Sequence, residues 1–225
     1  MSQKALRNLP AGDLDAGGMD ADDVAAQIAQ QTLKKREAQY ATEVRRLLDA
    51  ALDVMREGGT GSSPRVADIV AAAGLSNDAF YRHFASKEAL VAALLEDGSA
   101  RLRGYLEHQM AKERTAEAKV RRWVEGVLSQ AADDDVATTT RAVMWNGVAR
   151  HPSPAAALAT LLREPFAQLG SSDPDADAAL ASHATIGMLS DFLWQRLRPT
   201  RAQIDHVARF VLASLDRGDR APSTR

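Results

Sequence analysis

Residues 63–95 contain two short helical patterns joined by a glycine, and a third helical pattern begins just after them. The first pattern has apolar residues at the i, i+3, i+4, i+7 spacing of one buried stripe: Val66, Ile69, Val70 and Ala73. Gly74 follows, at a point where a helix end favours a residue in the left-handed conformation. This arrangement predicts a helix-turn-helix.

The second helix of the pair is expected to begin at Ser76, whose side chain can cap the free amides of its first turn. Phe80 and Phe84 are one turn apart and are expected to face inward together. A helical wheel anchored on them places the remaining residues on the outer face and its flanks: Asn77, Asp78, Ala79, Tyr81, Arg82 and His83. A short polar helix anchored by aromatic side chains suits insertion into the major groove of DNA.

These residues resemble the signature of TetR-family transcriptional regulators. The resemblance is carried by Ile69 and by three runs, AGLS at 73–76, FYRHF at 80–84 and SKEAL at 86–90, and it covers roughly residues 40–95. It implies an all-α fold, in which an N-terminal helix-turn-helix DNA-binding domain of three helices precedes a C-terminal helical bundle for ligand binding and dimerisation.

Two positions depart from the family pattern, because many members have Gly or Pro and then Thr where this chain has Asp78 and Ala79. The base preference of a relative therefore cannot be carried over. Asp78 can accept a hydrogen bond from a cytosine amino group, or it can stabilise the positive end of the helix as a first-turn acid.

The predicted DNA-binding residues are the cap and outer face of the second helix, together with flanking side chains that can reach phosphates: Ser63, Arg65, Ser76, Asn77, Asp78, Ala79, Tyr81, Arg82, His83 and Lys87. The net charge of the chain is -2, so these few basic groups have to be well placed to neutralise phosphate. Lys34, Lys35 and Arg36 form a further basic run, which can touch phosphate or a minor groove or can simply be solvated.

Four segments are expected along the chain: a mobile N-terminal extension at 1–36, the DNA-binding domain at 37–86, the ligand-binding and dimerisation domain at 87–217, and a disordered tail at 218–225. Apolar periodicity predicts a short helix near 21–33 and helices at about 37–57, 86–110, 114–131, 137–150, 154–169, 175–198 and 201–216. Tyr40 belongs to the apolar stripe of the helix at 37–57, and Pro165 predicts a kink or a shorter helix within 154–169.

Composition supports an all-helical protein that is neither exported nor inserted in a membrane. Apolar residues make up 45% of the chain and aromatic residues 5%, in long periodic segments that show almost no alternation. We find no stretch of eighteen uncharged apolar residues and no leader-like start. The chain has no cysteine, which suits a reducing cytoplasm, and no cofactor or metal is expected.

A homodimer is expected, because one short reading helix contacts too few base pairs to find a genomic site. A two-fold dimer doubles the sequence that is read and requires an inverted-repeat operator of double-stranded DNA. The family resemblance implies that the last two helices, 175–198 and 201–216, form the dimer interface.

The resemblance also implies a small-molecule inducer that binds within the bundle. The candidate ligand-binding residues are the large polarizable side chains and a few polar groups of the C-terminal half: Trp123, Arg141, Met144, Trp145, His183, Met188 and Phe192. For the apolar candidates core packing is the competing interpretation. For the polar ones it is surface exposure or a core hydrogen bond.

The functional hypothesis is a ligand-responsive DNA-binding regulator, a repressor released by a largely apolar small molecule when the helix that begins at Ser86 shifts. The alternative is a ligand-independent DNA-binding regulator or activator with a vestigial pocket. An enzyme is not expected, because the histidines are scattered and the chain has no HExxH, GxSxG or phosphate-binding glycine motif.

Overall fold

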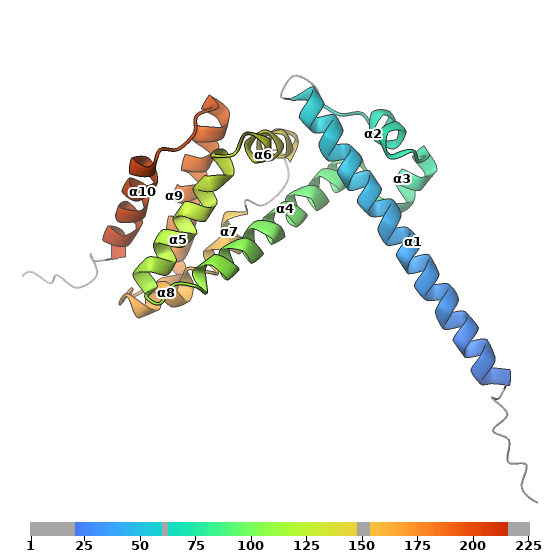
Figure 1. The fold of residues 1–225 in the computed structure, drawn as a ribbon, viewed down its shortest axis with the longest axis horizontal. Helices are drawn as coiled ribbons and strands as arrows, with labels where there is room; N and C mark the ends of the chain where they lie inside the picture. The colour runs from blue at the N-terminus through green and yellow to red at the C-terminus, as the bar shows by residue number, and fades with distance from the viewer. Residues whose placement is uncertain (1–20, 60–62, 148–153, 216–225) are drawn as a thin grey trace, which may run out of the picture. The chain divides into compact units, whose positions relative to one another are not determined.

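The computed structural model describes residues 21–59, 63–147 and 154–215, and every regular element within these ranges is a helix (Figure 1). The all-α prediction is confirmed. The chain divides into two compact units, residues 1–43 and 44–225, which are described separately. None of the described helices has the length and apolar character needed to cross a bilayer.

The first helix, α1 (Ala21–Gly58), is longer than predicted. It joins the two helices expected at 21–33 and 37–57, since no glycine or proline separates them and Lys34, Lys35 and Arg36 are good helix formers. Residues 21–36 are therefore helical, whereas the expectation of a mobile segment at 1–20 lies outside the described residues. Tyr40 is 47% exposed, so this member of the predicted apolar stripe lies outside the buried core.

The first buried cluster, which we call the head cluster, receives Ala142 and Val143 from α6 (Asp134–Gly147) and its other members from four helices. These are the C-terminal part of α1, α2 (Val66–Ala73), α3 (Asn77–His83) and the first turns of α4 (Lys87–Met110). The members from these helices and their caps are Leu47, Ala50, Ala51, Met55, Ile69, Val70, Ala73, Phe80, Phe84, Leu90, Val91 and Leu94. The predicted inward stripes of α2 and of the two phenylalanines are thus confirmed.

The second buried cluster, the body cluster, unites the remaining helices. They are α5 (Ala116–Leu128), α6 (Asp134–Gly147), α7 (Ala155–Ala159), α8 (Arg163–Gln168), α9 (Pro174–Gln195) and α10 (Arg201–Ser214), with a 3-10 turn at Ser129–Ala131. Helix α5 packs against α4, α8, α9 and α10, and α4 contributes to both clusters, with Leu94 in the head and Leu106 in the body.

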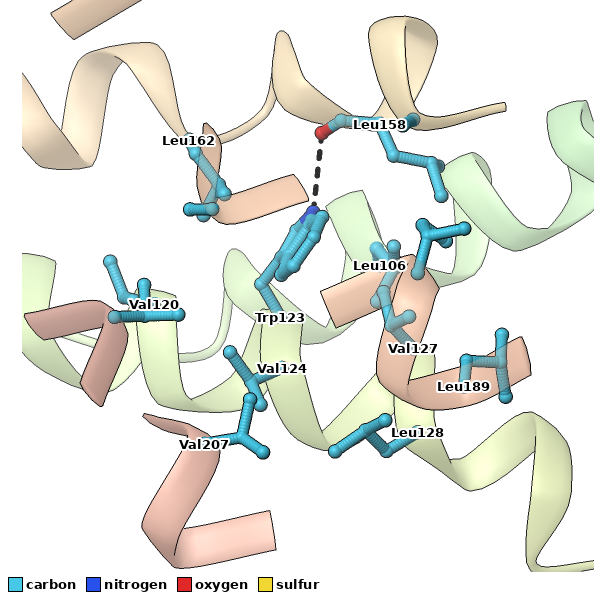
Figure 2. Packing of buried hydrophobic residues seen from close by; sticks show 14 of the residues in the cluster. Leu106, Val120, Trp123, Val124, Val127, Leu128, Leu158, Leu162, Leu189 and Val207 are labelled. Atoms are coloured by element: carbon cyan, nitrogen blue, oxygen red, sulfur yellow. Dashed lines mark hydrogen bonds between the residues drawn. The ribbon is translucent and has the colours of Figure 1, made fainter. Parts of the chain in front are cut away.

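Trp123 is the largest fully buried side chain of the body cluster (Figure 2). Its indole Nε1 donates a hydrogen bond to the carbonyl of Leu158 at 3.2 Å, which joins α5 to α7. In the same cluster, Figure 2 labels apolar side chains of α4, α5, α7, α9 and α10, together with Leu162 just before α8. Since the one polar atom of the indole has a partner, burial of this residue costs no unsatisfied hydrogen bond.

Local signals explain most helix boundaries of the body. Thr115, Asp173 and Thr200 each accept a hydrogen bond from a first-turn amide, and Gln203 completes a capping box with Thr200. The segment expected as one helix at 154–169 is two helices, α7 and α8. Pro165 lies in the first turn of α8, where a missing amide hydrogen is tolerated, so the helix restarts just before the proline.

Candidate nucleic-acid interface and the adjoining cavity

The turn between α2 and α3 is built by two residues that the sequence identifies. Gly74 ends α2 with φ +62°, while the amides of Gly74 and Leu75 donate to the carbonyls of Ala71 and Val70. Ser76 then begins α3, and its hydroxyl accepts a hydrogen bond from the amide of Ala79 at 3.1 Å. The helix-turn-helix is thus confirmed in geometry.

The side chain of Arg46 in α1 stabilises this turn through hydrogen bonding. Its guanidinium donates to the carbonyl of Ala73 at 2.5 Å and lies 3.4 Å from that of Gly74. These carbonyls belong to the C-terminal end of α2, where a cation is favourable. Sequence reasoning missed this contact, because a basic residue on an exposed helix face gives no sign of a partner 27 positions further along the chain.

Helix α3 exposes Asn77, Asp78, Tyr81 and Arg82, and His83 is half-buried. Ala79, however, is only 6% exposed, so its predicted place on the outer face was wrong. The reason is that Phe84 is not helical: it caps α3 with extended backbone, φ -130° and ψ 122°. The wheel anchored on Phe84 was therefore rotated, and Ala79 faces inward beside Phe80.

Arg65 and Lys87, the basic side chains that flank α3, each donate hydrogen bonds to a nearby side chain. Arg65 donates two hydrogen bonds of 2.9 Å to the carboxylate of Asp68, and this contact lowers the pKa of Asp68 and raises that of Arg65. Lys87, in the first turn of α4, donates to the hydroxyl of Ser63 at 2.5 Å. Both contacts are solvent-accessible, so a phosphate oxygen can compete for each cation.

A cavity of about 480 Å³ lies between α4, α6 and α9, and Leu52 of α1 also lines it. The remaining lining residues are Leu94, Leu95, Asp97, Gly98, Ser99, Arg101, Leu102, Tyr105, Gln130, Asp135, Val136, Thr139, Thr140, Val143, Met144, Pro154, Ile186 and Leu189. Its volume and apolar walls are those of a small-molecule site. On α6, positions 136, 139, 140, 143 and 144 share the face that lines it.

Of the seven predicted ligand-binding residues, Met144 alone lines this cavity. Trp123 is fully buried in the body cluster, and Arg141 and Phe192 line a separate hollow of about 170 Å³. The other three are exposed on α6 and α9: Trp145, His183 and Met188. Most of the predicted side chains thus fill the core, line the separate hollow or face solvent, and do not line this cavity.

One feature of the α4 sequence indicates the cavity. Leu94, Leu95 and Leu102 lie on one side of α4, and all three line the cavity. Gly98 and Ser99 stand between them and leave space where larger side chains would fill it.

The fold and the exposed α3 define a helix-turn-helix DNA-binding protein with a helical body. Residues 47–94 match the family model described as "Bacterial regulatory proteins, tetR family". This match shows that the helix-turn-helix part of the chain is similar to the DNA-binding domain of TetR-family transcriptional regulators.

Solved structures share the fold over most of the chain. The fatty acid degradation regulator FadR from Bacillus halodurans is 21% identical, with a TM-score of 0.55 over 76% of this chain and 94% of that one. A TetR-family transcriptional regulator from Pectobacterium atrosepticum is 21% identical, with a TM-score of 0.56 over 80% and 93%. A protein concerned with the control of antibiotic production by bacterial hormones is 26% identical, with a TM-score of 0.55 over 77% and 95%. A comparison with curated proteins gives no match.

Proposed function

We propose that this protein is a cytoplasmic, homodimeric repressor that binds an inverted-repeat operator through α3 and is released by a small molecule bound in the cavity. The DNA-binding domain would comprise residues 37–86, and residues 87–217 would supply ligand binding and dimerisation. The proposed function is binding rather than catalysis.

One residue, Val143 of α6, carries the proposal of ligand release. It is a member of the head cluster, 8% exposed, and it also lines the cavity. A molecule in the cavity therefore touches the same packed core that supports α3. Because packed cores respond to displacement in discrete steps, a shift of α6 or α4 can change the position of α3.

The proposed reading surface consists of α3 side chains that can donate to and accept from base edges. Asn77 and Arg82 are the residues best suited to bases, since amide and guanidinium groups make bidentate contacts in the major groove. Tyr81, Lys87, Arg65 and Ser63 are assigned to the phosphate backbone.

The proposed dimer face lies on α9 and α10. Leu180 is 70% exposed and Phe210 is 63% exposed, while Met188 and Trp194 are more than a third exposed. Large apolar side chains at such exposure on two neighbouring helices are typical of a subunit interface. Small residues, Ala184 and Gly187, separate them on α9 and would allow close approach of a second helix.

The experiment that tests the proposal is selection of the purified protein on random duplex DNA at near-physiological salt, followed by sequencing. An enriched inverted repeat with half-sites one helical turn apart, or a multiple of it, supports the sequence-reading dimer. Binding without an enriched motif would overturn it. The selected operator then serves as the probe for release by small molecules, and a regulator that no compound releases would correspond to the ligand-independent alternative.

A further inference from the structure

We infer that the cavity takes an uncharged, largely apolar molecule that carries a hydrogen-bonding oxygen, and that it discriminates against carboxylates and ammonium ions of the same size. This inference rests on the proposed function, because it assigns the chemical class of the small molecule that occupies the proposed effector site.

The walls provide an apolar lining from four helices. Side chains of α1, α4, α6 and α9 face the space: Leu52, Leu94, Leu95, Leu102, Val136, Val143, Met144, Ile186 and Leu189. Burial of apolar ligand surface against such walls is favourable in proportion to area. An ion placed there would lose its hydration without gaining a partner, which is costly.

Every charged residue that lines the cavity in the described part of the chain already has an ion-pair partner. Asp97 pairs with Arg101 one turn further along α4 at 2.5 Å, and Asp135 lies 3.5 Å from Arg56. A carboxylate ligand would have to displace Asp97 from Arg101 while lying close to two acidic groups. An ammonium ligand would meet carboxylates whose charge is already balanced. Both ion pairs are largely exposed to solvent, so they provide no buried counter-charge for an ion that enters the apolar part of the cavity.

Uncharged polar groups are nevertheless present on the α4 and α6 sides. The hydroxyl of Thr139 donates to the carbonyl of Asp135 at 2.8 Å and keeps its lone pairs. Thr140 and Ser99 line the same space, and Gln130 adds an amide. A ligand hydroxyl can donate to Thr139, and an ester or carbonyl oxygen can accept from the amide of Gln130, without bringing a charge into the cavity.

Three probes with the same ten-carbon chain test the inference: 1-decanol, decanoate and decylammonium, each over the same series of concentrations, below the solubility limit of decanol and below micelle formation by the two ions. Thermal unfolding of the full chain reports binding, because a ligand that prefers the native state raises the Tm. We expect decanol to bind with an apparent Kd roughly tenfold lower than either ion, since each ion carries a desolvation cost into the site.

Two matched glycine variants show whether decanol binds in the cavity. An added Cβ at Gly98 or at Gly104 meets nothing within 4 Å, and both glycines lie in α4, but Gly98 lines the cavity and Gly104 does not. Gly98→Leu should fill the cavity and abolish the decanol shift, whereas Gly104→Leu should retain it. Equal shifts in both variants would place decanol elsewhere and overturn the inference.

A variant of Asp97 tests whether charge determines which probe binds. Asp97→Asn removes the partner of Arg101, so it should increase the shift that decanoate produces. A wild-type protein that prefers decanoate or decylammonium would overturn the assigned class while leaving the cavity as an effector site. No shift with any probe would overturn the inference, while operator selection would still test DNA binding independently.

Discussion

An added Cβ on Gly74 would lie 3.0 Å from Nη2 of Arg46, the nitrogen that holds the carbonyl of Ala73. Gly74 also has φ +62°, a conformation that costs an L side chain about 1–2 kcal/mol. Gly74→Ala should therefore lower the free energy of unfolding by about 1–2 kcal/mol, measured by urea denaturation.

Gly104→Ala is the control, because Gly104 lies inside α4 with open space around it and should gain about 0.5–1 kcal/mol from higher helix propensity. We therefore expect Gly74→Ala to lower the free energy of unfolding and Gly104→Ala to raise it. A neutral Gly74→Ala would mean that Arg46 moves away and that the turn tolerates a side chain.

The helix-turn-helix could be predicted because the residues that determine it are close together in the sequence. Gly74 and Ser76 determine where α2 ends and where α3 begins within three residues of each other, and both were identified from the sequence. Ala79 was misplaced because the wheel continued through Phe84, which has extended backbone. Helix propensity alone could not show where α3 stops, since that depends on how Phe84 packs.

The cavity was not predictable from residue types, because it depends on which faces of α4, α6 and α9 meet. Trp123 and Met144 are both large apolar residues, yet the first is enclosed by the body cluster and the second lines the cavity. Thr139 and Thr140 are small and polar, and no local pattern distinguishes them from solvent-exposed threonines. These differences arise from contacts between residues far apart in the sequence.

Asp68 competes with DNA phosphate for Arg65. Both side chains of this pair are at the surface, and their hydrogen bonds hold the pKa of Asp68 below its usual value. Asp68→Asn should release Arg65 and tighten DNA binding, with the slope of log K against log salt steeper by about one unit if Arg65 then contacts phosphate. Titration of operator binding at several salt concentrations measures this change.

The direction of the pKa shift of Asp68 determines how this ion pair affects stability as the pH changes. Because the folded pKa of Asp68 is lowered, its contribution to stability is complete above the unfolded pKa of roughly 4 and is lost as the pH falls through the folded value. Asp68→Asn should therefore show a weaker loss of stability on acidification than the wild type. Parallel acid-denaturation curves for the two proteins would contradict the assignment.

Gly126 of α5 packs against α4. A Cβ added there would lie 2.4 Å from Cδ2 of Leu106, a side chain that is fully buried. Gly126→Ala should destabilise the body by about 1–3 kcal/mol through overpacking, despite the better helix propensity of alanine. In a double-mutant cycle, Leu106→Ala should cost less in the Gly126→Ala background than alone, and strict additivity would show that the clash is relieved elsewhere.

Arg82 and Lys87 should differ in what they do to operator binding. Arg82→Ala should change sequence preference by about 1–3 kcal/mol at one base position, because a guanidinium on α3 can read a base edge. Lys87→Ala should weaken binding to all sequences and reduce the salt slope by about one unit. Selection on random DNA with each variant separates the two effects, and a uniform loss for Arg82→Ala would reassign it to the backbone.

Leu180 tests the proposed dimer face directly. It lies on α9 with 70% of its surface exposed, so Leu180→Glu should leave the fold intact while placing two like charges near the two-fold axis of the proposed interface. Sedimentation at micromolar concentration should show dissociation to monomers, and operator affinity should fall with it because each monomer reads one half-site. Leu169→Glu is the matched control, since Leu169 follows α8 with 37% exposure and lies outside α9 and α10. A Leu180→Glu protein that remains dimeric would move the interface away from this part of α9.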